Sequence, residues 1–114
     1  MYDVTFVPQS NQASWVFIGM VTDLEGNPID ISACSMVFAV NEKNRGGQRL
    51  LASTANGKIT YPSLGVFRWF FTEGEMNGLA PGTYDTGLSL TNDDGTQTVQ
   101  LSVGSLPIVD GVVP

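Results

Sequence analysis

Apolar residues along the chain occur in short stretches that turn-forming residues separate. No long segment keeps the apolar spacing of an amphipathic helix, so helix is predicted to be a minor component. Short apolar stretches divided by Gly, Pro, Asn and Asp are typical of a β-sandwich or a barrel. We count about seven or eight such strands, which predicts an all-β fold of the immunoglobulin-like antiparallel β-sandwich class.

The segment 66–72 is predicted to be a strand with two distinct faces. Phe67, Trp69 and Phe71 alternate on one face, which we interpret as core because alternating aromatic side chains bury large areas. The opposite face carries Phe70. If that face is exposed, it forms an apolar patch that requires a partner.

The segment 14–23 is predicted to be a long strand, and it is apolar on both faces. A core on one side of a sheet does not explain this pattern. Segments 48–53 and 58–61 are predicted to pair as a hairpin, because Asn56-Gly57 between them is a strong hairpin signal.

Residues 73–79 indicate either a one-turn helix or an irregular loop, with Thr72 as the cap. The following strands are predicted at residues 84–91 and 96–104, joined by a hairpin loop at Asn92–Gly95. In the second of these strands, the side chains of Val99, Leu101 and Val103 are predicted to point inward.

The sandwich domain is predicted to span residues 1–104, and residues 105–114 form an apolar tail with two prolines and a glycine. Such a tail needs a surface, either on its own domain or on a neighbouring subunit that it reaches as an arm. We expect the tail to make assembly contacts and Phe70 to form a second contact patch. The tail contacts are Leu106, Ile108, Val109, Val112 and Val113.

The charge balance argues against two classes of partner. Eleven acidic and five basic residues give a net charge of −6 and a pI near 4.1. This negative field disfavours nucleic acid and anionic membranes. No apolar run approaches the roughly 20 residues that span a bilayer, and the N-terminus lacks a signal-peptide pattern. We therefore expect neither a nucleic-acid nor a membrane partner.

Composition also leaves little for catalysis. The chain has no histidine, the commonest general base and zinc ligand. Its one cysteine, Cys34, cannot form an internal disulfide or a thiolate metal site. Ser-Lys dyads are conceivable, but Lys43 lies in a polar loop and Lys58 follows a tight turn. We predict that the protein is not an enzyme and has no cofactor.

Two binding chemistries remain as the alternative, a glycan-binding or calcium-binding module without catalysis. Oxygen-bearing side chains gather in one loop, at Asp23, Glu25, Asn27 and Asp30. This first cluster does not match the EF-hand pattern, and Asp93 and Asp94 lie together in another loop. The aromatic row Phe67, Trp69 and Phe71 is the alternative platform for stacking a sugar.

Three groups of motifs follow one another along the chain. The first is a Ser14-Trp15 strand followed by Asp23-Leu24-Glu25-Gly26-Asn27-Pro28-Ile29-Asp30-Ile31. The second is Leu50-Leu51-Ala52-Ser53-Thr54, then Gly57-Lys58-Ile59-Thr60 and Gly65-Val66-Phe67-Arg68-Trp69. The third is Leu79-Ala80-Pro81-Gly82-Thr83-Tyr84, then Leu88-Ser89-Leu90-Thr91 and Asp93-Asp94-Gly95.

In this order, the motifs resemble small immunoglobulin-like β-sandwich proteins of tailed bacteriophages, and are similar to the N-terminal domain of baseplate upper proteins. The resemblance covers nearly the whole chain. It implies a structural virion protein, such as a baseplate, tail-fibre attachment or head-decoration component. It also implies other virion proteins as partners, a homo-oligomer or larger assembly, and a location in the virion, with the host cytoplasm during assembly.

Overall fold

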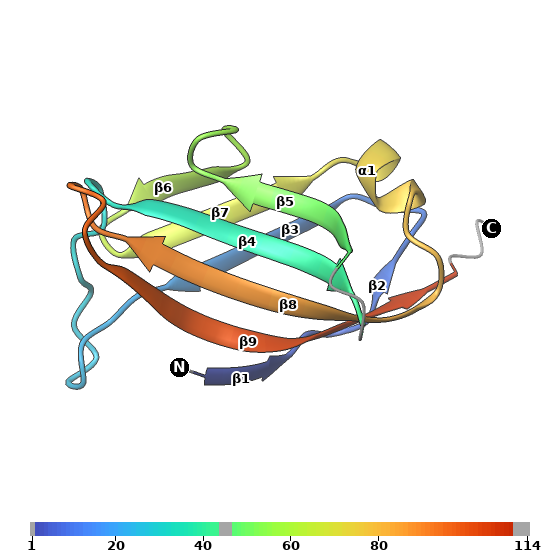
Figure 1. Cartoon of the computed structure of the whole chain (residues 1–114), viewed down its shortest axis with the longest axis horizontal. Helices are drawn as coiled ribbons and strands as arrows, with labels where there is room; N and C mark the ends of the chain where they lie inside the picture. The colour runs from blue at the N-terminus through green and yellow to red at the C-terminus, as the bar shows by residue number, and fades with distance from the viewer. Residues whose placement is uncertain (1, 44–46, 111–114) are drawn as a thin grey trace.

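The computed structural model describes residues 2–43 and 47–110, which form two packed sheets (Figure 1). The larger sheet contains β1 (Tyr2–Thr5), β2 (Gln9–Ser10), β4 (Ser35–Glu42), β5 (Gln48–Ser53), β8 (Gly82–Thr91) and β9 (Thr98–Val109). The smaller sheet contains β3 (Trp15–Met20), β6 (Ile59–Ser63) and β7 (Val66–Phe71). A single turn of helix, α1 (Glu73–Asn77), joins β7 to β8. The predicted all-β sandwich is confirmed.

The strand order is β1-β9-β8-β4-β5 in the larger sheet and β3-β7-β6 in the smaller one. The pairs within each sheet are antiparallel, except that β1 and β2 both pair with β9 in parallel. The larger sheet is therefore mixed, which differs from the wholly antiparallel prediction. No helix in the described ranges has the length and apolar character needed to cross a membrane.

Aromatic side chains fill the space between the sheets. Trp69 of β7 stacks on Phe38 of β4, with ring centroids 3.9 Å apart and planes at 11°. Phe17 of β3 stacks on the same indole at 4.6 Å. Phe67 and Phe71 are buried beside Trp69, so the predicted core face of this strand is confirmed.

The predicted hairpin of residues 48–53 and 58–61 is wrong. The first segment pairs with β4 and the second with β7, so the chain crosses between the sheets at this turn. Asn56 does form the turn, because its side-chain oxygen accepts from the amides of Ser53 and Lys58, both at 3.0 Å. A turn signal specifies local backbone shape, but not which strands pair beyond it.

The structure also corrects the predicted domain boundary at residue 104. β9 continues to Val109 and pairs with β8 as far as Gly82–Ile108. Leu106 and Ile108 are only 0% and 3% exposed, because alternation along the strand points both into the core. Neither side chain is free to make the assembly contact that we predicted.

A β-bulge explains why Val103, one of the three residues predicted to point inward on β9, does not. The register with β8 shifts between Leu88 and Ser89, which leaves Leu101 as an extra residue. A shift of one residue exchanges the faces of a strand. Val103 therefore pairs with Gly87 on the outer face, whereas Leu101 packs against the core. Val99 pairs with Leu90, which packs against the core, but it lies near the start of β9 and is 51% exposed.

Gly104 allows β1 to approach β9. The two strands pair with Val4 opposite Gly104, and a Cβ atom at position 104 would overlap the carbonyl oxygen of Val4. The obstacle is backbone, so a side-chain rotation cannot relieve it. Attachment of the N-terminal strand therefore depends on this glycine.

We expect Gly104→Ala to lower the free energy of unfolding by about 1–3 kcal/mol, the usual cost of overpacking. Urea denaturation measures this loss, and amide exchange should show β1 losing protection first. Gly87→Ala on β8 is the matched control, since its Cβ would meet only the flexible end of Gln100 at 3.2 Å. Equal stability of the two variants would contradict this role of Gly104.

Candidate interaction surface

The outer face of the smaller sheet is apolar and exposed. On β3, Val16, Ile18 and Met20 are 44%, 61% and 54% exposed. Their register partners on β7, in the same order, are the partly buried residues Phe70, Arg68 and Val66. We call these six residues the β3–β7 face. Contiguous apolar surface of this kind marks interaction sites in soluble proteins.

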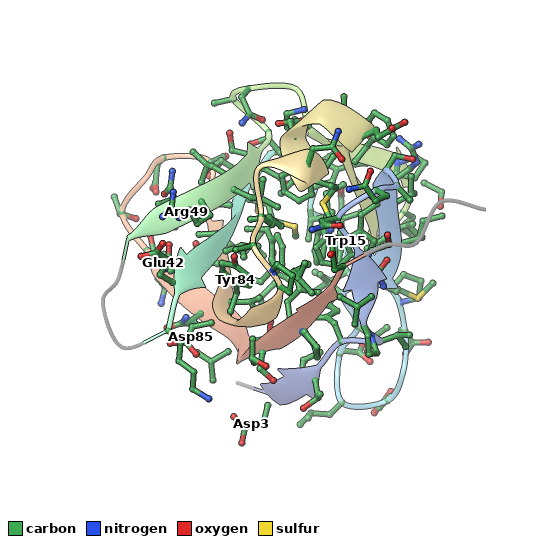
Figure 2. All side chains as sticks on the ribbon, turned by 90° about the vertical axis from the view of Figure 1, so that its right-hand side faces the viewer. Asp3, Trp15, Glu42, Arg49, Tyr84 and Asp85 are labelled. Atoms are coloured by element: carbon green, nitrogen blue, oxygen red, sulfur yellow. The ribbon has the colours of Figure 1, made fainter. Side chains whose placement is uncertain are left out.

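The inner face of β3 packs in the core. Packing of the core therefore does not explain why the outward side chains of this strand are also apolar. Trp15 is buried and Phe17 packs against the core, whereas Gly19 leaves room for the ring of Phe67. Figure 2 shows Trp15 pointing between the two sheets. The predicted double-sided apolar pattern of residues 14–23 is therefore a core face and a solvent face.

Arg68 is the one charged residue on the β3–β7 face. Its guanidinium carbon lies 5.8 Å from the ring centroid of Phe70, in a cation–π arrangement. Among the described residues, Arg68 forms no ion pair; the two ion pairs there are Arg49–Glu42 and Lys58–Glu75. The face is thus nearly uncharged on a chain with a net charge of −6.

An apolar cleft of about 360 Å³ opens beside β3, between the two sheets. Both sheets line it, with Phe17 and Met20 from β3, Trp69 from β7 and Leu101 from β9. Val4 and Phe6, from the N-terminal strand and the loop after it, form part of the same lining. None of the lining residues is charged.

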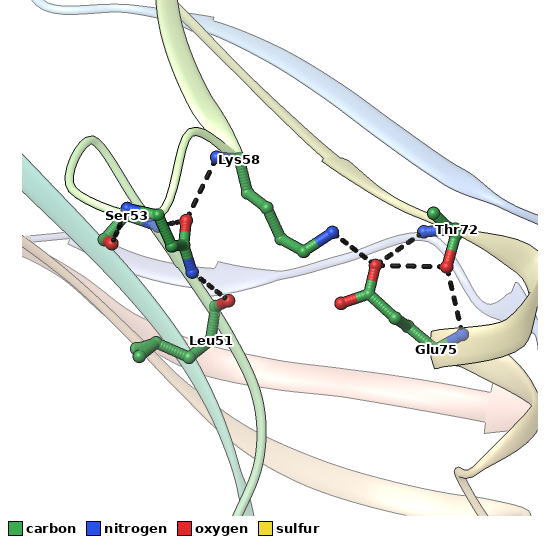
Figure 3. A network of polar contacts seen from close by, with 6 residues as sticks. Leu51, Ser53, Lys58, Thr72 and Glu75 are labelled. Atoms are coloured by element: carbon green, nitrogen blue, oxygen red, sulfur yellow. Dashed lines mark hydrogen bonds and ion pairs between the residues drawn. The ribbon is translucent and has the colours of Figure 1, made fainter.

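The polar network around Lys58 is structural (Figure 3). Lys58 pairs with Glu75, whose carboxylate also accepts from the Thr72 amide at 3.0 Å. The Thr72 hydroxyl accepts in turn from the Glu75 amide at 3.2 Å, which completes a capping box. The helix and its predicted Thr72 cap are confirmed, and Lys58 contacts a carboxylate rather than a serine.

Partial burial raises the pKa of Glu75, but the hydrogen bonds from Lys58 and Thr72 and the Lys58 charge outweigh it. The net result is a pKa below the ordinary value of 4.5. A carboxylate whose pKa is lowered in the folded state stabilises the fold at pH values above its pKa in the unfolded state. This stabilisation is lost as the pH falls through its pKa in the folded state.

The acidic loop residues form turns. Asp23 accepts from the amides of Asn27 and Glu25 at 3.0 and 2.9 Å, and the bond from Asn27 is the largest influence on its pKa. Desolvation raises the pKa, but the hydrogen bonds together lower it. Asp94 accepts from the hydroxyl and amide of Thr96, which lowers its pKa likewise. In the described part of the chain, no three acidic, Cys or His side chains are arranged to hold a metal.

The aromatic row proposed as a sugar platform is not available for stacking. Phe67, Trp69 and Phe71 are all buried in the core. Their alternation fits either a core face or an exposed platform, and the position of the second sheet decides between the two.

The structure places the predicted contact residues in different environments. Phe70 lies on the β3–β7 face as expected, although it is partly buried, and Val109 is 47% exposed at the end of β9. Val112 and Val113 lie outside the described residues. Sequence reasoning missed the more exposed side chains of β3, although the two apolar faces of residues 14–23 were the signal for them.

No protein-family model matches the chain, and no curated protein matches it significantly.

We expect Glu75→Gln to be less stable than the wild type at pH 7, and the difference to shrink as pH falls below 4.5. Urea unfolding at pH 7 and at acidic pH measures both values. Glu73→Gln, which removes a carboxylate from the same helical turn but not from the network, serves as the control. A difference that stays constant with pH would contradict the role of the ionised Glu75.

Proposed function

We propose that the chain is a structural, non-catalytic protein of a tailed-bacteriophage particle, and that it acts through protein–protein assembly. The observation that carries this proposal is the exposure of Val16, Ile18 and Met20 on a strand whose other face is committed to the core. These side chains contribute little to the isolated fold. Burying them against another subunit removes apolar surface from water, which is a favourable free-energy change that folding of the free chain does not provide.

The chemistry of the β3–β7 face fits a protein partner. Fully burying one aliphatic side chain is worth about 1.5–3 kcal/mol, so three half-exposed ones supply a few kcal/mol on binding. The centres of protein interfaces are depleted in charge and enriched in aromatic residues, Met and Arg. Phe70, Met20 and Arg68 match this composition. A single cation is far too little for nucleic acid.

The resemblance to phage β-sandwich proteins supports the setting of the proposal, a virion. The partners would be other virion proteins or further copies of the chain, first in the host cytoplasm and then in the particle. A baseplate, a tail-fibre attachment or a head decoration would each use such a surface. Among the described residues, the alternative of a glycan-binding or calcium-binding module has no exposed aromatic row and no acidic cluster to support it.

The setting is tested by mass spectrometry of gradient-purified particles, with copies counted against the major capsid protein. We expect the chain to be present. A few copies per particle would indicate the tail or baseplate, and hundreds would indicate a head decoration. Absence from the particles would overturn the proposed setting.

The surface is tested by a matched pair of variants. Ile18→Lys places a charge on the β3–β7 face, and Val99→Lys places the same charge at a similarly exposed site on β9. Both should fold with wild-type thermal stability. We expect Ile18→Lys to lower incorporation into particles at least about tenfold, equivalent to about 1.4 kcal/mol, and Val99→Lys to leave it unchanged. Equal incorporation of both variants would argue against this surface.

A further inference from the structure

We propose that the free edge of β3 and the cleft beside it accept an extended apolar segment of another polypeptide. The segment would add to the smaller sheet as a fourth strand, next to β3. This inference rests on the proposed assembly function and specifies the form of one partner. It follows from the edge, the cleft and the charges around them.

In the described structure, β3 is the one sheet edge without a feature that blocks pairing with a further strand. β5 carries Arg49, paired with Glu42, and a bulge in its ladder. β6 contains Pro62 and another bulge, and β1 has four residues and an exposed Asp3 (Figure 2). Natural proteins block edges with such charges, prolines, bulges and short strands. β3 has six residues with neither charge nor proline.

The backbone of β3 has hydrogen-bonding groups to offer. It lies at the end of the order β3-β7-β6, so its ladder runs to β7 alone. Among the described residues, no other backbone hydrogen bond involves Trp15–Met20. In an antiparallel strand, alternate residues direct their N–H and C=O groups to opposite sides. About half of these groups therefore face away from β7, toward an incoming strand.

The cleft gives that strand a place for its side chains. Side chains of an added strand alternate between the two faces of the sheet. Every second one would enter the cleft, and the others would extend the β3–β7 face. An apolar cavity of about 150 Å³ holds a benzene molecule, so a cleft of about 360 Å³ has room for roughly two apolar side chains.

A second copy of the chain cannot fill the cleft with its own β3. The inward side chains of that strand, Trp15 and Phe17, belong to the core of the copy that carries them. Two copies could pair along β3, but each cleft would stay empty. The occupant is therefore a segment without a sandwich of its own, as in strand addition by an extended arm.

The surroundings define the chemistry of the segment. Its centre must be uncharged, because no charged residue lines the cleft. Asp3 precedes the lining residue Val4 and Asp23 follows the lining residue Thr22, so a basic residue on the segment matches them in charge. Trp69, in the cleft lining, has a buried indole N–H without an acceptor in the described part of the chain. Its indole resonance is therefore a local reporter.

The probe is a synthetic peptide, Lys-Val-Thr-Val-Thr-Val-Lys, titrated into the full chain and followed by NMR. We expect amide shifts on β3 and on Val4 and Leu101, a shift of the Trp69 indole signal, and slower amide exchange along Trp15–Met20. The same peptide with Pro in place of its central Val cannot pair regularly, and should bind at least about tenfold more weakly. A peptide with Glu at both ends should also bind more weakly, and added salt should narrow that difference.

Met20→Lys tests the site on the protein, because Met20 lies on β3 and lines the cleft while being half exposed. We expect it to weaken binding of the lysine-ended peptide at least about tenfold, and the control Val99→Lys to have no effect. Absence of binding at millimolar peptide would overturn the inference. So would shifts confined to Phe70 and Val66, or pairing of two copies along β3 that excludes the peptide.

The two proposals fail in different ways. If no peptide binds but Ile18→Lys still lowers incorporation into particles, strand acceptance is wrong and the assembly role stands. If the peptide binds but the chain is absent from particles, the proposed virion setting is wrong and the edge remains a strand acceptor.

Discussion

The stacking of Trp69 on Phe38 joins the two sheets, and the arrangement of the other strands depends on it. The rings lie 3.9 Å apart and nearly parallel, and Phe17 stacks on the same indole. This contact fixes which face of β7 and β3 points inward, because a slip of one residue would exchange the faces. The exposure of Ile18 is therefore a consequence of the register that builds the core.

The unequal size of the sheets leaves that surface open. Six strands on one side face three on the other, and β3 ends the smaller sheet without a neighbour beyond it. The N-terminal strand lies across the opening as part of the larger sheet, so it forms the wall of a cleft rather than a cover for β3. The net charge of −6 keeps free copies apart by repulsion, which suits a chain with an exposed apolar edge.

Features that depend on residues close together in the sequence could be predicted. Features that depend on the pairing of strands far apart in the sequence could not. The Thr72 cap depends on Glu75 three residues later, and the alternation around Trp69 depends on one strand. The crossing at Asn56 and the bulge beside Leu101 depend on which strands pair, and no local pattern contains that choice. For the same reason Phe70 could be named as a surface residue, whereas the cleft, which needs both sheets, could not.

Photo-crosslinking in the phage particle that we propose contains the chain tests the proposed assembly role of the β3–β7 face most directly. A benzophenone amino acid placed at position 18 reports which molecule lies within a few ångströms of that side chain, and the same group at position 99 is the control. We expect position 18 to crosslink to a protein subunit of the particle, and position 99 to give no crosslink. A crosslink from position 99 and none from position 18 would show that the assembly surface lies elsewhere.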